Sequence, residues 1–183
     1  MKPSIWIVIV GLALLLWFLA RERRPKMTAQ ADPKIYSGLR DLILHGSREK
    51  LGISPRSKST EPWGVVMDWG IPTGTATVVA LADGTASVYL SSGGGLIGGG
   101  QSHESIRNAA KQVVEIANEV QPSMHATSDY PLPQNGQVMF YLLSDSGVFT
   151  GAASDEDMRG HRNPLYKLGD AAQNVITEYR RIQ

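Results

Sequence analysis

The residues best suited to bind a ligand lie in a glycine-rich run at 91–102, which contains six glycines. Glycine allows a backbone to approach a ligand closely, and amide groups ahead of a helix favour an anion. We therefore predict a ligand or partner site formed by Ser92, Gly93, Gly94, Gly95, Leu96, Ile97, Gly98, Gly99, Gly100 and Ser102.

Two known phosphate motifs fit this run poorly. Gly93, Gly95 and Gly98 satisfy G-x-G-x-x-G, but a dinucleotide site also needs a parallel βαβ unit and an acidic residue about 20 positions later. No lysine follows the glycines, which excludes a P-loop. The structural alternative is a flexible connection that lets the following helix cross over the sheet and that could also pack Leu96 and Ile97. An exposed Leu96-Ile97 tip could equally contact a partner or a membrane.

Other polar residues indicate structural roles. Asp68 lies between Met67 and Trp69 on a predicted strand, so alternation places it on the opposite face, where we expect it to meet solvent. A buried catalytic carboxylate is the less favoured alternative. Ser102 can cap the following helix, and His103 and Glu104 belong to its start. The acidic run at 155–157 fits a solvated loop or a short helix.

The rest of the chain shows no recognisable catalytic or metal-binding pattern. Four histidines are scattered without ligand spacing, there is no cysteine, and no serine has a G-x-S-x-G context. No catalytic residue, metal or cofactor is predicted.

Residues 4–20 form an apolar, uncharged run that predicts a transmembrane helix. At about 1.5 Å per residue it spans roughly 25 Å, against about 30 Å for a hydrocarbon core. Trp6 and Trp17 suit the two interfaces, and the basic segment 21–26 forms a stop. A cleaved signal peptide fits less well because the positive charge follows the apolar run instead of preceding it.

The charges of the chain also predict on which side of the membrane the domain lies, and they argue against a nucleic-acid partner. The basic segment 21–26 places the following domain in the cytoplasm by the positive-inside rule. Without residues 1–26, 13 Lys and Arg stand against 16 Asp and Glu, a net charge of −3. We expect no nucleic-acid partner, because the domain lacks the basic footprint that phosphates require.

We expect the anchor and its basic stop to end at residue 26 and a linker to follow at 27–62. Within this linker, the sequence predicts a short helix at 35–44 and a mobile loop at 45–62. Alternating and β-branched residues predict five strands, and helical spacing predicts two longer helices. Asp83-Gly84 suits a two-residue type I′ turn. The expected strands are 63–71, 75–82, 85–91, 137–144 and 147–152, and the expected helices are 102–121 and 164–182.

This pattern predicts an α+β domain at 63–183, with one roughly five-stranded antiparallel sheet and packed helices in the order α-β-β-β-α-β-β-α. The first functional hypothesis is a non-enzymatic interaction or scaffold domain, held in the cell membrane by a single pass. It would bind a protein partner or itself. The second is an anion-binding or sensing domain that uses residues 93–100, and a small enzyme of unknown type ranks third.

Overall fold

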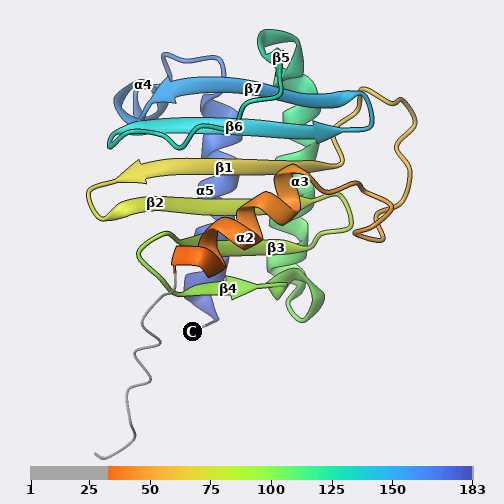
Figure 1. Ribbon diagram of the computed structural model, residues 1–183, viewed down its shortest axis with the longest axis horizontal. Coiled ribbons are helices and arrows are strands. Elements are labelled where there is room, and N and C mark those ends of the chain that lie inside the picture. The colour runs from red at the N-terminus through yellow and green to blue at the C-terminus, as the bar shows by residue number, and fades with distance from the viewer. Residues whose placement is uncertain (1–32, 183) are drawn as a thin grey trace, which may run out of the picture.

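The computed structural model describes residues 33–182 (Figure 1). The predicted anchor and its basic stop lie outside the described residues, so the transmembrane helix stays a prediction. Within residues 33–182, none of the helices has the length and apolar character needed to cross a bilayer.

The described chain is an α+β fold built on one antiparallel sheet, which confirms the predicted class. The sheet has seven strands instead of about five, in the order β4-β3-β2-β1-β6-β7-β5. The strands are β1 Gly64–Ile71, β2 Gly74–Leu81, β3 Ala86–Leu90, β4 Gly95–Ile97, β5 His125–Thr127, β6 Gln137–Ser144 and β7 Gly147–Ser154.

The two strands that the sequence did not predict, β4 and β5, form the opposite edges of the sheet. Each has three residues, which is too short for alternation of apolar and polar side chains to be recognised. Strand β4 also lies inside the glycine-rich run. Because glycine has a low β-propensity, the composition of this run does not indicate a strand.

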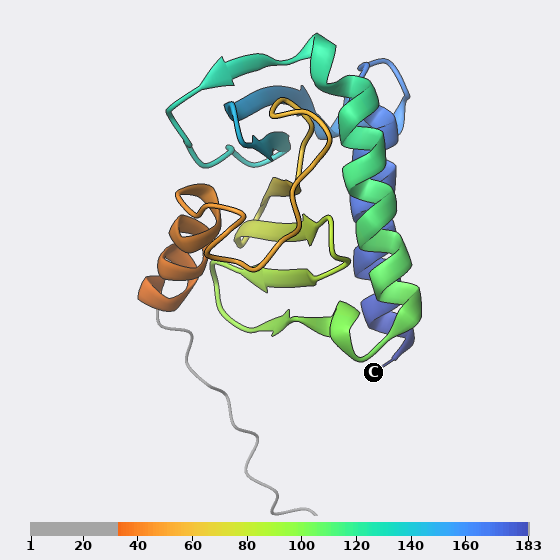
Figure 2. The same ribbon diagram turned by 90° about the vertical axis from the view of Figure 1, so that its right-hand side faces the viewer.

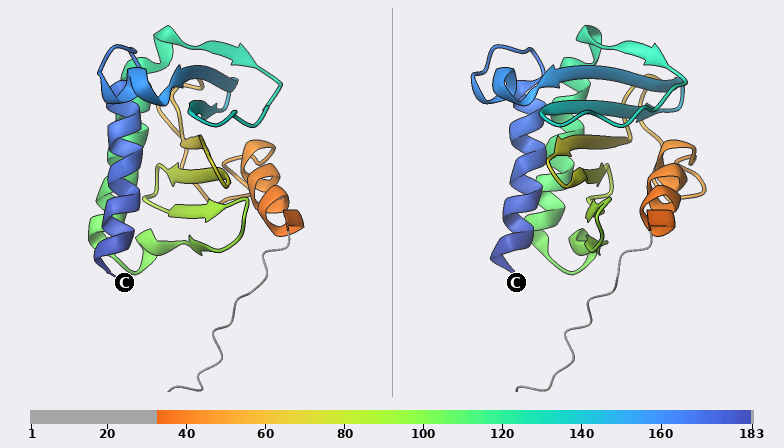
Figure 3. Two further views of the ribbon diagram at one scale, coloured as in Figure 1. Left: turned by 90° about the vertical axis from the view of Figure 1, so that its left-hand side faces the viewer. Right: turned by 60° about the vertical axis from the view of Figure 1, so that its left-hand side comes forward.

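Helices cover both faces of the sheet. The long helices α3 Glu104–Val120 and α5 Tyr166–Arg181 lie side by side on one face, and α2 Pro33–Leu44 lies on the other (Figures 2 and 3). The short elements are α4 Asp155–Arg159 and the 3₁₀ turns η1 Gly99–Gln101 and η2 Gln121–Ser123. The result is a three-layer domain with two apolar cores.

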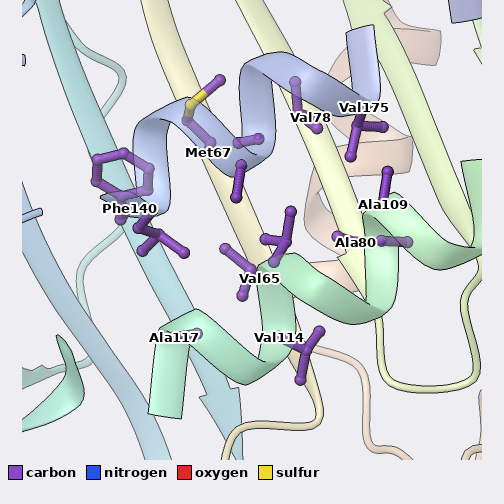
Figure 4. Packing of buried hydrophobic residues seen from close by; sticks show 14 of the residues in the cluster. Val65, Met67, Val78, Ala80, Ala109, Val114, Ala117, Phe140 and Val175 are labelled. Carbon is purple, nitrogen blue, oxygen red and sulfur yellow. The ribbon is translucent and has the colours of Figure 1, made fainter. Parts of the chain in front are cut away.

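The larger core lies between the sheet and helices α3 and α5 (Figure 4). Helix α3 presents alanines and valines spaced along its inner face, such as Ala109 and Val114, to Val65 and Ala80 of the sheet. Small side chains at these positions let the helix approach the strands closely, which fixes its path across the sheet.

The smaller core lies under α2 and includes the segment predicted as a linker. Tyr36 and Leu44 of α2 pack with Val66 and Tyr141 of the sheet. Ile53 belongs to the same core and is buried, although it lies within the predicted loop at 45–62. Parts of the predicted linker are therefore packed against the domain, beginning at Tyr36.

The hairpin between β2 and β3 has a different turn from the one predicted. A type I′ turn needs positive φ at both central residues, but at Asp83-Gly84 only Gly84 has one, at 92°. Leu81 N–H instead donates to the Thr85 carbonyl at 2.9 Å, which leaves three connecting residues. The Asp83 carboxylate accepts the Thr85 N–H at 2.8 Å, and this bond favours the longer connection.

Candidate functional site

The glycine-rich run forms a short edge strand and a helical turn. Strand β4 pairs antiparallel with β3, with Val88 opposite Leu96. The chain then makes the turn η1 and enters α3. The prediction that the run links a strand to a helix is therefore correct, but the run also contributes a strand of its own.

Several amide groups of this run donate hydrogen bonds within the domain. Gly98 N–H donates to the Ala86 carbonyl at 2.9 Å, and Gly99 N–H donates to the Tyr179 hydroxyl at 2.9 Å. His103 N–H donates to the Gly99 carbonyl at 3.0 Å. The N–H groups of Gly98 and Gly99 therefore already have partners within the domain. Anion binding at residues 93–100 stays a prediction.

The start of α3 differs from the predicted cap. His103, and not Ser102, occupies the N-cap position, and no side chain caps the helix there. Glu104 is the first residue of α3, as the sequence predicted for a residue favoured by the helix dipole. The Ser102 amide bonds instead to the Gly99 carbonyl at 3.2 Å, within the turn that precedes the helix.

Two of the glycines are required by close packing. A Cβ atom on Gly99 would overlap the Tyr179 ring, and one on Gly100 would overlap the carbonyl of Gly84. Tyr179 also donates its hydroxyl to the Ala86 carbonyl at 2.7 Å. The run is thereby fastened to α5 and to the β2–β3 turn through Gly99 and Gly100, whereas Ile97, which the structural alternative expected to be packed, is exposed.

An apolar groove lies between α2 and the β4 edge of the sheet. Its volume is about 230 Å³, and it is lined mainly by residues of α2, β2, β3 and the β2–β3 turn, with Ile97 contributed by β4. Leu42 on α2 and Ile97 on β4 form part of its lining and are 59% and 66% exposed. Ile35, two turns before Leu42 on α2, is also exposed. The groove is a concave apolar surface open to solvent.

A buried ion pair holds α2 on the sheet beside this groove. Arg40 Nε donates to Asp68 Oδ2 at 2.8 Å, and Thr77 Oγ1 donates to Oδ1 at 2.6 Å. Arg40 also donates from Nη2 to the Tyr130 carbonyl at 2.9 Å. Asp68 is 0% exposed, and its burial raises the pKa of the carboxyl, against the opposing effects of Arg40 and Thr77.

The prediction that Asp68 meets solvent is wrong. Alternation correctly places Asp68 on the face opposite Met67, which belongs to the larger core. That second face, however, is covered by α2 instead of by water. A signal for this exists in the sequence, because Arg40 lies four residues from both Tyr36 and Leu44 and so shares their helical face.

Tyrosines surround the ion pair. The Tyr36 hydroxyl lies 2.9 Å from Thr77 Oγ1, and the Tyr141 hydroxyl donates to the Pro131 carbonyl at 2.6 Å. The buried Tyr89 hydroxyl has no hydrogen-bond partner within residues 33–182. Tyr89 lines the groove, whereas Asp68 and Arg40 are not among its lining residues. The geometry thus gives the pair a fastening role.

Ionisation of the Tyr141 hydroxyl should make the folded protein less stable at alkaline pH. Burial raises the pKa of Tyr141 to about 12, from an ordinary value of 10.0. The folded state therefore favours the neutral phenol, and this stabilisation is complete below pH 10 and is lost as the pH rises toward 12. Thermal unfolding followed between pH 9 and 12 should show a falling Tm, with a smaller fall in Tyr141→Phe. An equal fall in both proteins would contradict the assignment.

The acidic run at 155–157 forms the start of α4, in agreement with the short-helix alternative. Ser154 caps this helix by accepting the Asp157 N–H at 3.0 Å. The Ser154 hydroxyl donates to the Asp157 carboxylate at 2.7 Å and Arg162 Nε donates to it at 2.8 Å, and these two bonds lower the pKa of Asp157. These acidic groups are used in local structure, away from the groove.

Comparison with known proteins found no match to this chain among family models, curated proteins or solved structures. The functional interpretation therefore depends on the groove, the ion pair and the sequence of the N-terminal segment.

Proposed function

We propose that this chain is a non-enzymatic interaction domain, tethered to the cell membrane by one N-terminal pass, with its folded part in the cytoplasm. It recruits a protein partner through the groove between α2 and β4. The observation that carries this proposal is the exposure of Leu42 and Ile97 around an apolar concavity. Exposed apolar surface of this kind is typical of interaction sites.

The position of the groove relative to the tether supports the same proposal. Residues 21–32 connect the apolar run to Pro33, the first residue of α2. Fully extended, this connection reaches at most roughly 40 Å, at about 3.3–3.6 Å per residue. A groove walled by α2 would consequently stay close to the membrane surface, where a partner could be held at high local concentration.

Purification of the tagged full chain from its native membrane tests this function. We expect a stoichiometric protein to accompany the wild type and to be lost from Leu42→Ser. Leu132→Ser is the matched control, because Leu132 is also an exposed leucine but is not a groove residue. It should retain the partner.

Two results would contradict the proposed function. One is a wild-type protein that purifies alone from gently solubilised membranes. The other is a partner that binds Leu42→Ser and Leu132→Ser equally well. Since Leu42 is more than half exposed, circular dichroism should show that both variants keep the fold.

A further inference from the structure

Among residues 33–182, no strand pairs with the outer edge of β4. Leu90 N–H donates to the Gly94 carbonyl at 3.0 Å, and Gly98 N–H donates to the Ala86 carbonyl at 2.9 Å. Bonded and non-bonded pairs alternate along an antiparallel ladder, so the backbone of Leu96 faces β3. The backbone N–H and C=O groups of Gly95 and Ile97 therefore face away from the sheet, and β4 is the last strand in the order.

This edge is complementary to itself. If β4 pairs antiparallel with a second β4 about Leu96, each Gly95 lies opposite Ile97 of the second copy. Gly95 is exposed and has no side chain, so the large exposed side chain of Ile97 would lie over its backbone, beside Tyr89, which a Cβ atom on Gly95 would overlap. The two Gly95–Ile97 pairs would form four N–H···O bonds, and the two Leu96 residues would lie directly opposite each other.

The tethers are compatible with this arrangement. The two-fold axis of such a pair is perpendicular to the sheet, so it relates the α2 face of one copy to the α2 face of the other. Both chains would enter α2 on the same side of a continuous sheet, near β4 (Figure 1). Two anchors could then insert in one bilayer, a step that rests on the tether proposed above.

We propose that the β4 edge is the binding site for a second copy of this chain, which joins two seven-stranded sheets through Gly95 and Ile97. Three residues on each side limit the pairing to four hydrogen bonds. The association is therefore weak in dilute solution and depends on confinement to a membrane, where the effective concentration is high.

Cysteine cross-linking of the full chain in its membrane tests this pairing, because the natural sequence has no cysteine. Directly opposite residues of a non-bonded pair have Cα atoms about 4.5 Å apart, within the range of a disulfide. With a mild copper oxidant, Leu96→Cys should form a disulfide-linked dimer. Ala126→Cys, an exposed central residue of the other edge strand β5, should stay monomeric.

A second substitution separates pairing from folding. Adding Ile97→Pro to Leu96→Cys removes an outward N–H, which an edge strand tolerates, and should abolish the cross-linked dimer. The proposal is overturned if Leu96→Cys stays monomeric, if it links to a different protein, or if Ala126→Cys or the Ile97→Pro variant cross-links equally well. If Leu96→Cys fails while Leu42→Ser still loses its partner, only the self-pairing is overturned and the proposed function stands.

Discussion

Asp68→Asn and Arg40→Met should each lower the free energy of unfolding by about 3–5 kcal/mol, because either change leaves a buried charge without its partner. Asp68 is fully buried and Arg40 is nearly so, and a bond of 2.8 Å joins them. Urea unfolding of the two variants, followed by circular dichroism, measures the loss. Values within about 1 kcal/mol of the wild type, the range typical of an exposed ion pair, would contradict the assigned role.

The double variant and an exposed pair provide the controls. Removing both charges should cost clearly less than the sum of the two single changes, since neither charge is then left uncompensated. Arg162→Met removes an arginine that bonds to Asp157 on the surface and should leave the unfolding midpoint close to that of the wild type.

The ion pair also bears on the groove. Arg40 lies on α2 between residues that line the groove, such as Leu39 and Leu42. Loosening α2 would displace one wall of the groove while leaving β4 in place. Variants that lose the pair should therefore bind a groove partner less well even under conditions where the sheet stays folded.

Gly99→Ala should lower the free energy of unfolding by about 1–3 kcal/mol, the cost of overpacking a filled site. The new methyl group would overlap the Tyr179 ring, and Tyr179 is held by hydrogen bonds to Gly99 and Ala86. Thermal or urea unfolding of the variant measures this effect. A neutral result would show that the glycine run can move away from α5.

Gly38→Ala is the matched control for this substitution. Gly38 lies within α2, and a Cβ atom there would meet nothing within 4 Å. Alanine is favoured over glycine in a helix by about 1 kcal/mol, so this variant should be more stable than the wild type. The two alanine substitutions are thus expected to shift the unfolding midpoint in opposite directions.

Most of the sheet could be predicted from the sequence because its strands carry strong local signals. The predicted strand at 137–144 coincides with β6, and the helical spacing of residues 106–120 corresponds to α3. Strands β4 and β5 could not be found in this way, since three residues carry almost no periodicity. Strand β4 pairs with β3 in a local hairpin, whereas β5 depends on pairing with β7, which lies much further along the chain.

The residues of the candidate site were harder to predict, because they depend on which layer covers which face. Asp68 follows the alternation of its strand, but its burial depends on α2, which precedes it by 24 residues. The groove combines Leu42 with Ile97, two residues far apart in sequence. Of the predicted site residues, Ile97 lines the groove, whereas Gly99 and Gly100 pack within the domain.

The central claim is that the segment at 4–20 holds this domain at a membrane, and alkaline carbonate extraction of native membranes tests it most directly. The wild-type chain should remain in the membrane pellet, and a Leu14→Arg, Leu15→Arg variant should move to the soluble fraction, because charge at the centre of a spanning helix opposes insertion. A wild-type chain found in the soluble fraction would contradict the account.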